Sequence, residues 1–204
     1  MFITIEGPDG AGKSTQVNNI AKYFEDRGYS VVRTREPGGT VISEKLREIV
    51  LDPENTEMSD VAETMIYAAA RAQHVAEKIA PALSRGEVVI CDRFIDSSIA
   101  YQGYGRELGE KVREVNLIAV NGTMPDVTFF LDLDPAIGIE RISANREGAD
   151  RLEQEAMDFH YKIYEGFKEI AQREPERFIV IDASRSVDEI KADIYAKLDE
   201  ITKR

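Results

Sequence analysis

Residues 7–14 constrain this chain more than any other segment. They read Gly-Pro-Asp-Gly-Ala-Gly-Lys-Ser and directly follow an apolar, β-branched run at residues 2–5. The spacing G-x-x-x-x-G-K-S between a strand and a helix lets glycines turn successive backbone N–H groups toward phosphate oxygens. The sequence therefore predicts a loop that holds the phosphates of a nucleoside triphosphate at the start of a helix.

Two side chains at the end of this loop have the chemistry for a triphosphate and its metal. Lys13 is placed to reach the β- and γ-phosphates, and the hydroxyl of Ser14 can bind Mg²⁺. Residues 87–91 form a second apolar run, and Asp92 follows it directly. Asp92 is therefore the expected carboxylate ligand of the same Mg²⁺, with capping of a turn at the strand end as its alternative role.

Short apolar runs alternate along the chain with stretches of helical periodicity. The predicted strands are residues 2–5, 30–33, 87–91, 127–133 and 178–182. The predicted helices are residues 13–27, 41–51, 58–85, 96–121 with a break near 103–109, 135–145, 151–173 and 186–203. This alternation predicts an α/β fold, a three-layer sandwich with a five-stranded parallel sheet of the P-loop NTPase type. The 204 residues suit a single domain over 1–204.

The charge of the chain argues against two classes of partner. Its formal net charge is −12, and so acidic a surface repels nucleic-acid backbones and anionic lipid. We therefore expect no nucleic acid and no membrane as partners, and no apolar stretch approaches the roughly 20 residues that span a bilayer. The single Cys91 cannot form an internal disulfide, and residues 1–6 are expected to be a strand rather than a secretion signal. A cytoplasmic location is expected.

A phosphate-binding loop leaves the phosphoryl acceptor open among water, a protein side chain and a small molecule. The guanine-reading segments N-K-x-D and T-K-x-D of small regulatory GTPases are absent from the sequence. Asp92 is followed by Arg93 where motor ATPases carry a second acidic residue, and a positive charge there suits a second phosphate group. Arg35 and Arg47 could converge on it, although Arg35 could instead pair with a carboxylate. We expect a phosphorylated small molecule as the acceptor.

Four motifs in a fixed order give the chain a family resemblance. They are G-P-D-G-A-G-K-S-T from Gly7, T-R-E-P-G-G from Thr34, Y-A-A-A-R from Tyr67 and D-R-F-I-D-S-S-x-A-Y-Q-G from Asp92. A further segment, D-R-L-E at residues 150–153, follows the region that serves the family as a mobile lid. The motifs run nearly end to end, and the chain resembles the bacterial thymidylate kinases.

The resemblance implies a set of residues around a dTMP acceptor. Arg71 matches the arginine that hydrogen-bonds the thymine base, and Tyr67, one helical turn earlier, matches an aromatic residue, often Phe, that stacks on the ring. Tyr101 matches a residue that excludes a ribose 2′-hydroxyl, and Asp9 matches a carboxylate near the 3′-hydroxyl. The other substrate-binding residues that the resemblance implies are Glu36, Arg47, Arg93, Ser98 and Gln102.

The resemblance also implies a lid over about residues 143–151 and a binding site for ATP. Part of the family carries a catalytic arginine in the phosphate loop, where this chain has Gly10. The resemblance therefore assigns the catalytic arginine to the lid, with Arg146 as the first choice and Arg151 as the second. The other catalytic residues that it implies are Lys13, Arg93 and Asp9. The implied ATP-binding residues are Arg141 and Ala183 near the adenine, together with Gly7, Pro8, Asp9, Gly10, Ala11, Gly12, Lys13, Ser14 and Thr15.

The implied reaction is transfer of the γ-phosphoryl group of ATP to dTMP in dTTP biosynthesis, with Mg²⁺ as cofactor. Because the acceptor phosphate oxygen is already nucleophilic, no strong general base is needed, and His74 and His160 are expected to be packing or surface residues. Another nucleoside monophosphate kinase, or a nucleotide-binding regulatory switch, stays open as an alternative. The family is typically homodimeric, and the apolar periodicity of residues 58–85 and 109–121 could supply the interface.

Overall fold

The computed structural model describes residues 1–143 and 150–203, which contain one sheet of five parallel strands. The strand order is β2-β3-β1-β4-β5, with β1 at the centre. The strands are β1 (Phe2–Glu6), β2 (Val31–Arg35), β3 (Val88–Asp92), β4 (Val127–Asp132) and β5 (Phe178–Asp182). Each lies within two residues of its predicted range, and the predicted five-stranded parallel sheet is confirmed.

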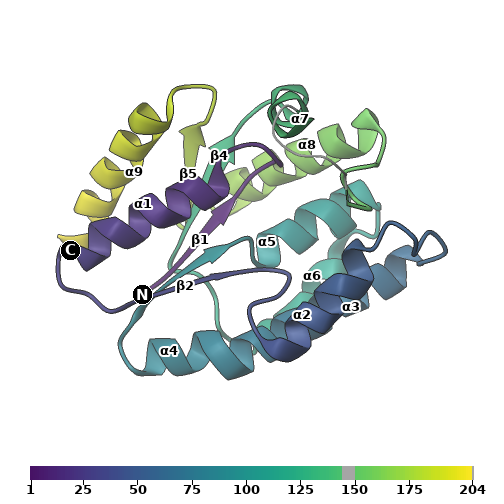
Figure 1. Ribbon diagram of the computed structural model, residues 1–204, viewed down its shortest axis with the longest axis horizontal. Coiled ribbons are helices and arrows are strands. Elements are labelled where there is room, and N and C mark those ends of the chain that lie inside the picture. Colours follow the sequence, from purple (N-terminus) through teal and green to yellow (C-terminus); the bar gives the residue numbers. More distant parts are fainter. Residues whose placement is uncertain (144–149, 204) are drawn as a thin grey trace.

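Helical segments connect and cover the strands (Figure 1). They are α1 (Lys13–Glu25), α2 (Val41–Leu51), α3 (Asp60–His74), the π-helical turn η1 (Val75–Ile79), α4 (Ala80–Ser84), α5 (Ile95–Ser98), the π-helical turn η2 (Ile99–Gly105), α6 (Glu110–Val120), α7 (Pro135–Ser143), α8 (Met157–Arg173) and α9 (Val187–Thr202). The predicted break between residues 96 and 121 is confirmed, because η2 and α6 are separate. None of the described helices combines the length and the apolar character that crossing a bilayer requires.

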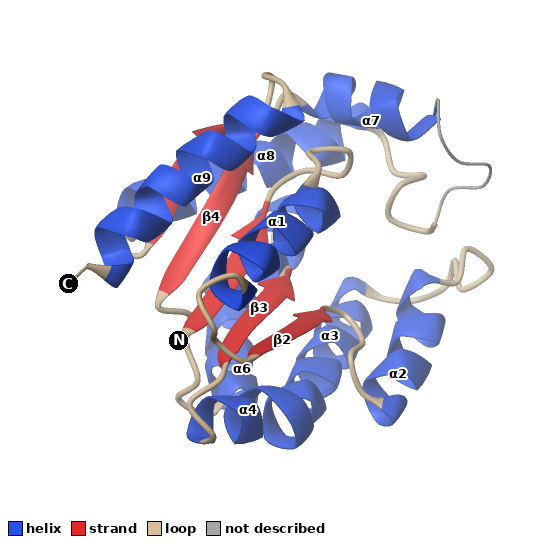
Figure 2. Cartoon of the chain, turned by 60° about the vertical axis from the view of Figure 1, so that its left-hand side comes forward, coloured by secondary structure: helices blue, strands red, loops and turns tan. Residues whose placement is uncertain are grey.

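The alternation of side chains along β1 builds a separate apolar core on each face of the sheet. Phe2 packs into a core formed with α3, η1, α4 and α8, whereas Ile3 and Ile5 pack into a core formed with α1 and α9. Figure 2 shows α1 and α9 together in front of the sheet, with α3, α4 and α6 near its other side. These helix, sheet and helix layers confirm the predicted three-layer sandwich.

One predicted helix boundary is wrong. The helix predicted from residue 151 begins only at Met157, because the Asp150 carboxylate accepts the backbone N–H groups of Leu152 and Glu153 and holds a turn there. The helix predicted over 58–85 is confirmed as a continuous helical stretch from α3 to α4, with the π-helical turn η1 within it. Of the helix predicted over 135–145, the structure describes Pro135–Ser143 as α7, and residues 144–149 lie outside the described residues.

The carboxyl ends of three strands meet at one edge of the sheet. Asp92 of β3 lies beside Ile5 of β1 and beside Arg35 of β2 in the strand register. The phosphate loop leaves β1 at the same edge and leads into α1. In parallel sheets this edge is where ligands bind, so the fold brings the predicted loop, Asp92 and the segment after β2 to one place.

Candidate active site

A cavity of about 890 Å³ opens at this edge of the sheet. Its walls come from the phosphate loop, the segment after β2, α3, the segment after β3, the end of α7 and the loop before α9. Most of the predicted site residues line it. The exceptions are Gly7, Pro8, Ala183 and Arg151, and Arg146 lies outside the described residues.

The loop begins the helix α1 at Gly12, whose backbone has a left-handed φ of 90°. Lys13 lies almost fully buried beneath the loop, where its ammonium group donates to the carbonyls of Gly7 (3.0 Å) and Pro8 (2.7 Å). Burial, and then the positive charge of Arg93, lowers the pKa of Lys13 to about 8. The ammonium group is thus buried near a second positive charge, while the carboxylates of Asp9, Asp92 and Glu6 act in the opposite direction.

The loop has no room for a side chain at Gly10. A Cβ there would lie 2.2 Å from the carbonyl oxygen of Gly138 in α7, and the φ of Gly10 is +77°. The end of α7 also contributes Arg141, whose Nη1 lies 3.4 Å from the carbonyl oxygens of Gly10 and Ala183. Close packing of α7 on the loop therefore gives a physical reason for glycine at this position.

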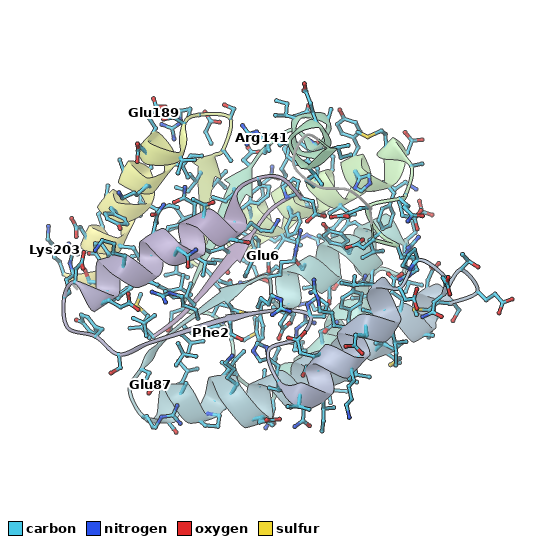
Figure 3. All side chains as sticks on the ribbon, in the orientation of Figure 1. Phe2, Glu6, Glu87, Arg141, Glu189 and Lys203 are labelled. Atoms are coloured by element: carbon cyan, nitrogen blue, oxygen red, sulfur yellow. The ribbon has the colours of Figure 1, made fainter. Side chains whose placement is uncertain are left out.

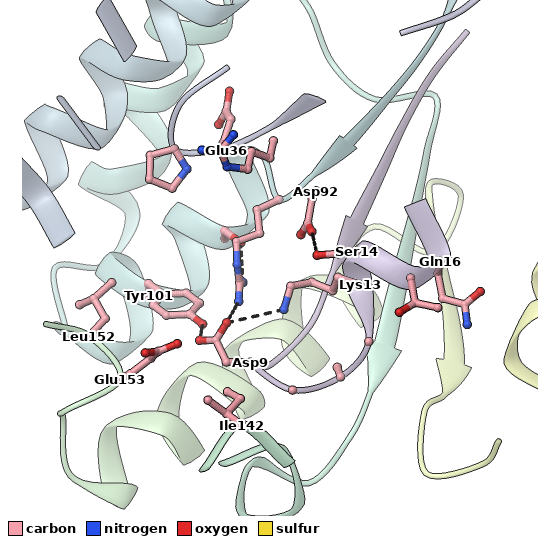
Figure 4. A pocket seen from close by; sticks show the side chains of 18 of the residues that line it. Asp9, Lys13, Ser14, Gln16, Glu36, Asp92, Tyr101, Ile142, Leu152 and Glu153 are labelled. Atoms are coloured by element: carbon pink, nitrogen blue, oxygen red, sulfur yellow. Dashed lines mark hydrogen bonds and ion pairs between the residues drawn. The ribbon is translucent and has the colours of Figure 1, made fainter. Parts of the chain in front are cut away.

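Ser14 and Asp92 form the pair predicted to hold a metal. The Ser14 hydroxyl donates to Asp92 Oδ2 at 2.8 Å, and both side chains line the cavity (Figure 4). A hydroxyl and a carboxylate are the oxygen ligands that Mg²⁺ prefers, and it commonly takes the others from phosphates and water. This pair of oxygens therefore fits Mg²⁺.

Asp9, Arg93 and Tyr101 converge on one point of the cavity. Figure 4 shows the Tyr101 hydroxyl directed at the Asp9 carboxylate. Arg93 Nη2 donates to Asp9 Oδ1 at 2.6 Å, and the Tyr101 hydroxyl donates to Asp9 Oδ2 at 3.0 Å. Arg93 adopts a left-handed φ of 66°, which turns the chain sharply after β3. Burial acts to raise the pKa of Asp9, but Arg93 and Lys13 together hold it well below its usual range.

A buried carboxylate behind this group was missed by the sequence analysis. Glu6 ends β1 with no exposed surface, and Figure 3 shows it inside the molecule. It accepts the backbone N–H of Phe94 (2.7 Å) and the hydroxyl of Ser97 (2.6 Å). Burial, and then the nearby Asp96 carboxylate, raises the pKa of Glu6 to about 7. Its place as the last residue of an apolar strand was the available signal.

Tyr67 and Arg71 of α3 line the far wall of the cavity. Arg71 is fully buried, and its Nε donates to Glu36 Oε2 at 2.7 Å. Its other partners are Ser98 Oγ, Asn116 Oδ1 and the Phe94 carbonyl oxygen. Four of the five guanidinium N–H groups therefore donate within the described chain, which leaves one Nη2 N–H for a ligand. Asn116 was not predicted, and no local pattern marked it.

Glu36 is held by a buried histidine as well as by Arg71. The Glu36 Oε1 atom lies 2.9 Å from Nδ1 of His74, and Nε2 of His74 lies 2.6 Å from the Thr34 hydroxyl. His74 has no exposed surface, so of its two predicted roles, packing or surface, the structure excludes the surface. It lies three residues after Arg71 on the same helix, which is how the sequence could have linked the two.

Arg35 and Arg47 also line the cavity, but with different partners. Arg35 donates to Glu44 at 3.0 Å on an exposed surface, which is the carboxylate pairing predicted as its alternative. Arg47 donates to the Pro37 carbonyl oxygen at 2.8 Å. Burial, and then the charge of Arg35, lowers the pKa of Arg47. The three predicted arginines thus share one cavity, with Arg93 deepest.

Arg151 lies apart from this group. Its Nη2 donates to Glu63 at 2.6 Å and its Nε donates to the Val50 carbonyl oxygen, and it does not line the cavity. The sequence analysis did not select Glu63, although it lies four residues before Tyr67 and eight before Arg71, on the same face of α3. That spacing was the signal for it.

A loop with the phosphate-binding pattern and a second, arginine-bearing wall line one cavity, and together they define a P-loop phosphotransferase. The thymidylate kinase family model matches residues 5–194. This chain belongs to the thymidylate kinase family, as its motifs predicted.

Individual relatives agree with this assignment over the whole chain. The thymidylate kinase of Geobacillus sp. is 48% identical over 206 residues, covering 100% of this chain and 98% of its own. The thymidylate kinase of Lactobacillus delbrueckii is 50% identical over 194 residues, covering 94% of this chain and 92% of its own. The crystal structure of thymidylate kinase from Ehrlichia chaffeensis superposes with a TM-score of 0.80 at 33% identity and covers 98% of both chains.

Proposed function

We propose that the protein transfers the γ-phosphoryl group of ATP to dTMP, giving dTDP and ADP in dTTP biosynthesis. The observation that carries the proposal is the two-sided cavity, with Lys13 on one side and Arg93 and Arg71 on the other. Two anionic ligands that face each other there would bring an acceptor phosphate oxygen up to the γ-phosphorus. Alignment and charge neutralisation are the main sources of catalysis in such transfers.

On the donor side, we assign the triphosphate to the backbone N–H groups of Gly7 and residues 9–15 and to Lys13. Arg141 and Ala183 border the proposed adenine position, and their mutual contact at 3.4 Å supports this pairing. Ser14 and Asp92 would hold Mg²⁺, which neutralises charge on the donor phosphates when bound. The Ser14 hydroxyl already points at the Asp92 carboxylate, which supports the shared site.

On the acceptor side, we assign the phosphate of dTMP to Arg93 and Arg47, and its deoxyribose to Asp9 and Tyr101. The Tyr101 hydroxyl bonded to Asp9 fixes the ring where it would exclude a 2′-hydroxyl. The thymine would stack on Tyr67 and receive the remaining Nη2 N–H of Arg71, whose side chain is oriented by Glu36. Ser98 and Gln102 complete the proposed base site.

We further propose that residues 1–204 act as one domain with a lid over about residues 143–151, which supplies a catalytic arginine. Arg146 remains our first assignment and lies outside the described residues. Arg151, the second, is bound to the buried carboxylate of Glu63, so contact with the phosphates would require it to leave that partner. This pairing favours Arg146.

We also propose a homodimer that works in the cytoplasm. Apolar side chains of α3 and α6 lie exposed on the two helices, which pack against each other: Val61, Met65, Leu117 and Ile118. Such side chains gain stability when a second copy covers them, and an isologous interface would use the same patch twice. The cytoplasm is proposed because it supplies ATP and keeps the single thiol reduced.

The experiment that tests the activity measures ADP release with dTMP, AMP, UMP and CMP as acceptors. We expect dTMP to stimulate release far more than the other three. Equal stimulation by several nucleotides would indicate a different nucleoside monophosphate kinase, and slow release that none of them stimulates would indicate a regulatory switch. Lys13→Ala, with its fold checked by circular dichroism, should abolish stimulation.

A further inference from the structure

Glu63 is a buried carboxylate that holds several elements of the structure together. It has no exposed surface and accepts hydrogen bonds on both oxygens. Its Oε1 accepts from Gln102 Nε2 at 2.8 Å, and its Oε2 accepts from Arg106 Nη2 at 3.1 Å and Arg151 Nη2 at 2.6 Å. The partners come from η2, from the residue after it and from the turn after residue 150.

The Glu63 carboxylate is fixed in place by Arg106, which has three further contacts of its own. Arg106 also pairs with Glu155 at 2.6 Å and with Asp60 at 3.4 Å. Its guanidinium lies 4.5 Å from the centre of the Phe159 ring. Because Arg106 cannot turn without losing these contacts, Glu63 keeps its orientation toward Gln102.

This arrangement determines which end of the Gln102 amide faces the ligand. An amide offers a donor at Nε2 and an acceptor at Oε1, whereas a carboxylate offers acceptors alone. With Nε2 directed at Glu63, the carbonyl Oε1 is left for the cavity, which Gln102 lines. No side chain in the described residues 1–143 and 150–203 donates to that oxygen.

We propose that Glu63 is a positioning residue that locks the Gln102 carbonyl toward the bound base and so makes the pocket select an imide N–H. This deepens the proposed function and rests on it, because it places the base of the acceptor beside Gln102. Thymine carries such an N–H at its ring nitrogen N3, whereas cytosine presents a lone pair there. Against a fixed carbonyl oxygen, the cytosine ring would leave two acceptors facing each other.

The test compares two acceptors that share the methyl group and the sugar, dTMP and 5-methyl-dCMP. Glu63→Gln lets the Gln102 amide turn either way, so we expect the ratio of kcat/KM for dTMP over 5-methyl-dCMP to fall about tenfold, the size of one buried hydrogen bond. KM for dTMP should rise while KM for ATP stays unchanged. Glu155→Gln is the matched control, since it removes a charge from Arg106 without touching Gln102, and it should leave the ratio unchanged.

A double-mutant cycle separates orientation from general loosening. In a Gln102→Ala background, Glu63→Gln should no longer change the ratio, because the amide that it orients is gone. An unchanged ratio in Glu63→Gln overturns the proposal, as does an equal fall in Glu155→Gln or a full effect that persists without Gln102. If Glu63→Gln does not fold, NMR of the wild type provides the test. The side-chain amide signals of Gln102 are those that disappear in Gln102→Ala, and we expect one of the two amide protons to be protected from exchange with solvent. Fast exchange of both protons overturns the proposal.

These outcomes are distinct from a failure of the proposed function. If the wild-type protein shows no preference for dTMP over AMP, UMP and CMP, the activity assignment fails before Glu63 is considered. If the wild type prefers dTMP and Glu63→Gln retains its full preference over 5-methyl-dCMP, the function stands and the positioning role is wrong.

Discussion

Replacing Glu6 with glutamine should make the protein less sensitive to pH. Glu6 is buried at the end of β1, and burial, with the nearby Asp96 carboxylate, raises its pKa from 4.5 to about 7. In Glu6→Gln, the amide oxygen can accept the Phe94 N–H while the amide N–H donates to the Ser97 hydroxyl oxygen. The substitution therefore preserves the two hydrogen bonds and removes only the ionisable group.

The expected magnitude follows from the pKa of Glu6. Its carboxyl keeps a proton to higher pH in the folded protein than in the unfolded chain, so its contribution to stability is complete below pH 4.5. That contribution is lost as the pH rises through about 7. Between about pH 5 and about pH 8 this loss lowers the free energy of unfolding of the wild type by roughly 2 to 3 kcal/mol. Glu6→Gln lacks this loss, so its stability relative to the wild type should rise by the same amount.

The assay is urea unfolding followed by circular dichroism at about pH 5 and about pH 8, with the free energy of unfolding taken from the linear dependence on urea. Glu48→Gln on α2 is the matched control, because Glu48 is exposed and the same substitution there removes a carboxylate without affecting a buried site. A difference between Glu6→Gln and the wild type that is the same at both pH values would refute the argument, because it would mean that Glu6 does not change protonation across this range.

Three further predictions concern Lys13, Tyr101 and the exposed Ile118. Because Lys13 has a pKa of about 8, ATP binding at about pH 9 should take up a proton and be about tenfold weaker than at about pH 7; calorimetry in two buffers that shows no proton uptake would contradict this. Tyr101→Ala should lower the preference for dTMP over ribothymidine monophosphate about tenfold, and Tyr101→Phe should keep it; a preference unchanged in Tyr101→Ala would rule out the ring as the gate. Ile118 is 81% exposed, and Ile118→Asp should shift light scattering from dimer to monomer; a wild-type monomer would refute the dimer.

The sequence predicted the sheet and the phosphate loop well because both depend on local patterns. Apolar runs bounded by turn residues set the strands, and the loop between β1 and α1 is defined by glycines and Lys13 at fixed spacing. The start of α8 was predicted six residues too early, because the side chain of Asp150 competes for backbone N–H groups in a stretch that otherwise has helical periodicity.

The residues that the sequence analysis missed are those that act on other side chains. Asn116 meets Arg71 from a helix 45 residues away, and Glu6 meets Ser97 across 91 residues. Neither residue has a local spacing that reports its partner. Glu63 differs, because its spacing from Tyr67 along α3 was visible, but a carboxylate one turn before an aromatic residue also occurs on many solvated helices.

The two sides of the cavity are coupled through one guanidinium group. Arg93 pairs with Asp9 and donates to Ser97. Burial lowers the pKa of Lys13, and the charge of Arg93 adds to this effect. The Ser97 hydroxyl in turn donates to Glu6, so a chain of hydrogen bonds links Arg93 to the end of β1. A substitution at Arg93 would therefore change the protonation of Lys13 as well as the binding of an acceptor phosphate. Loss of activity in such a variant cannot be assigned to the acceptor side until ATP binding has been measured at the same pH.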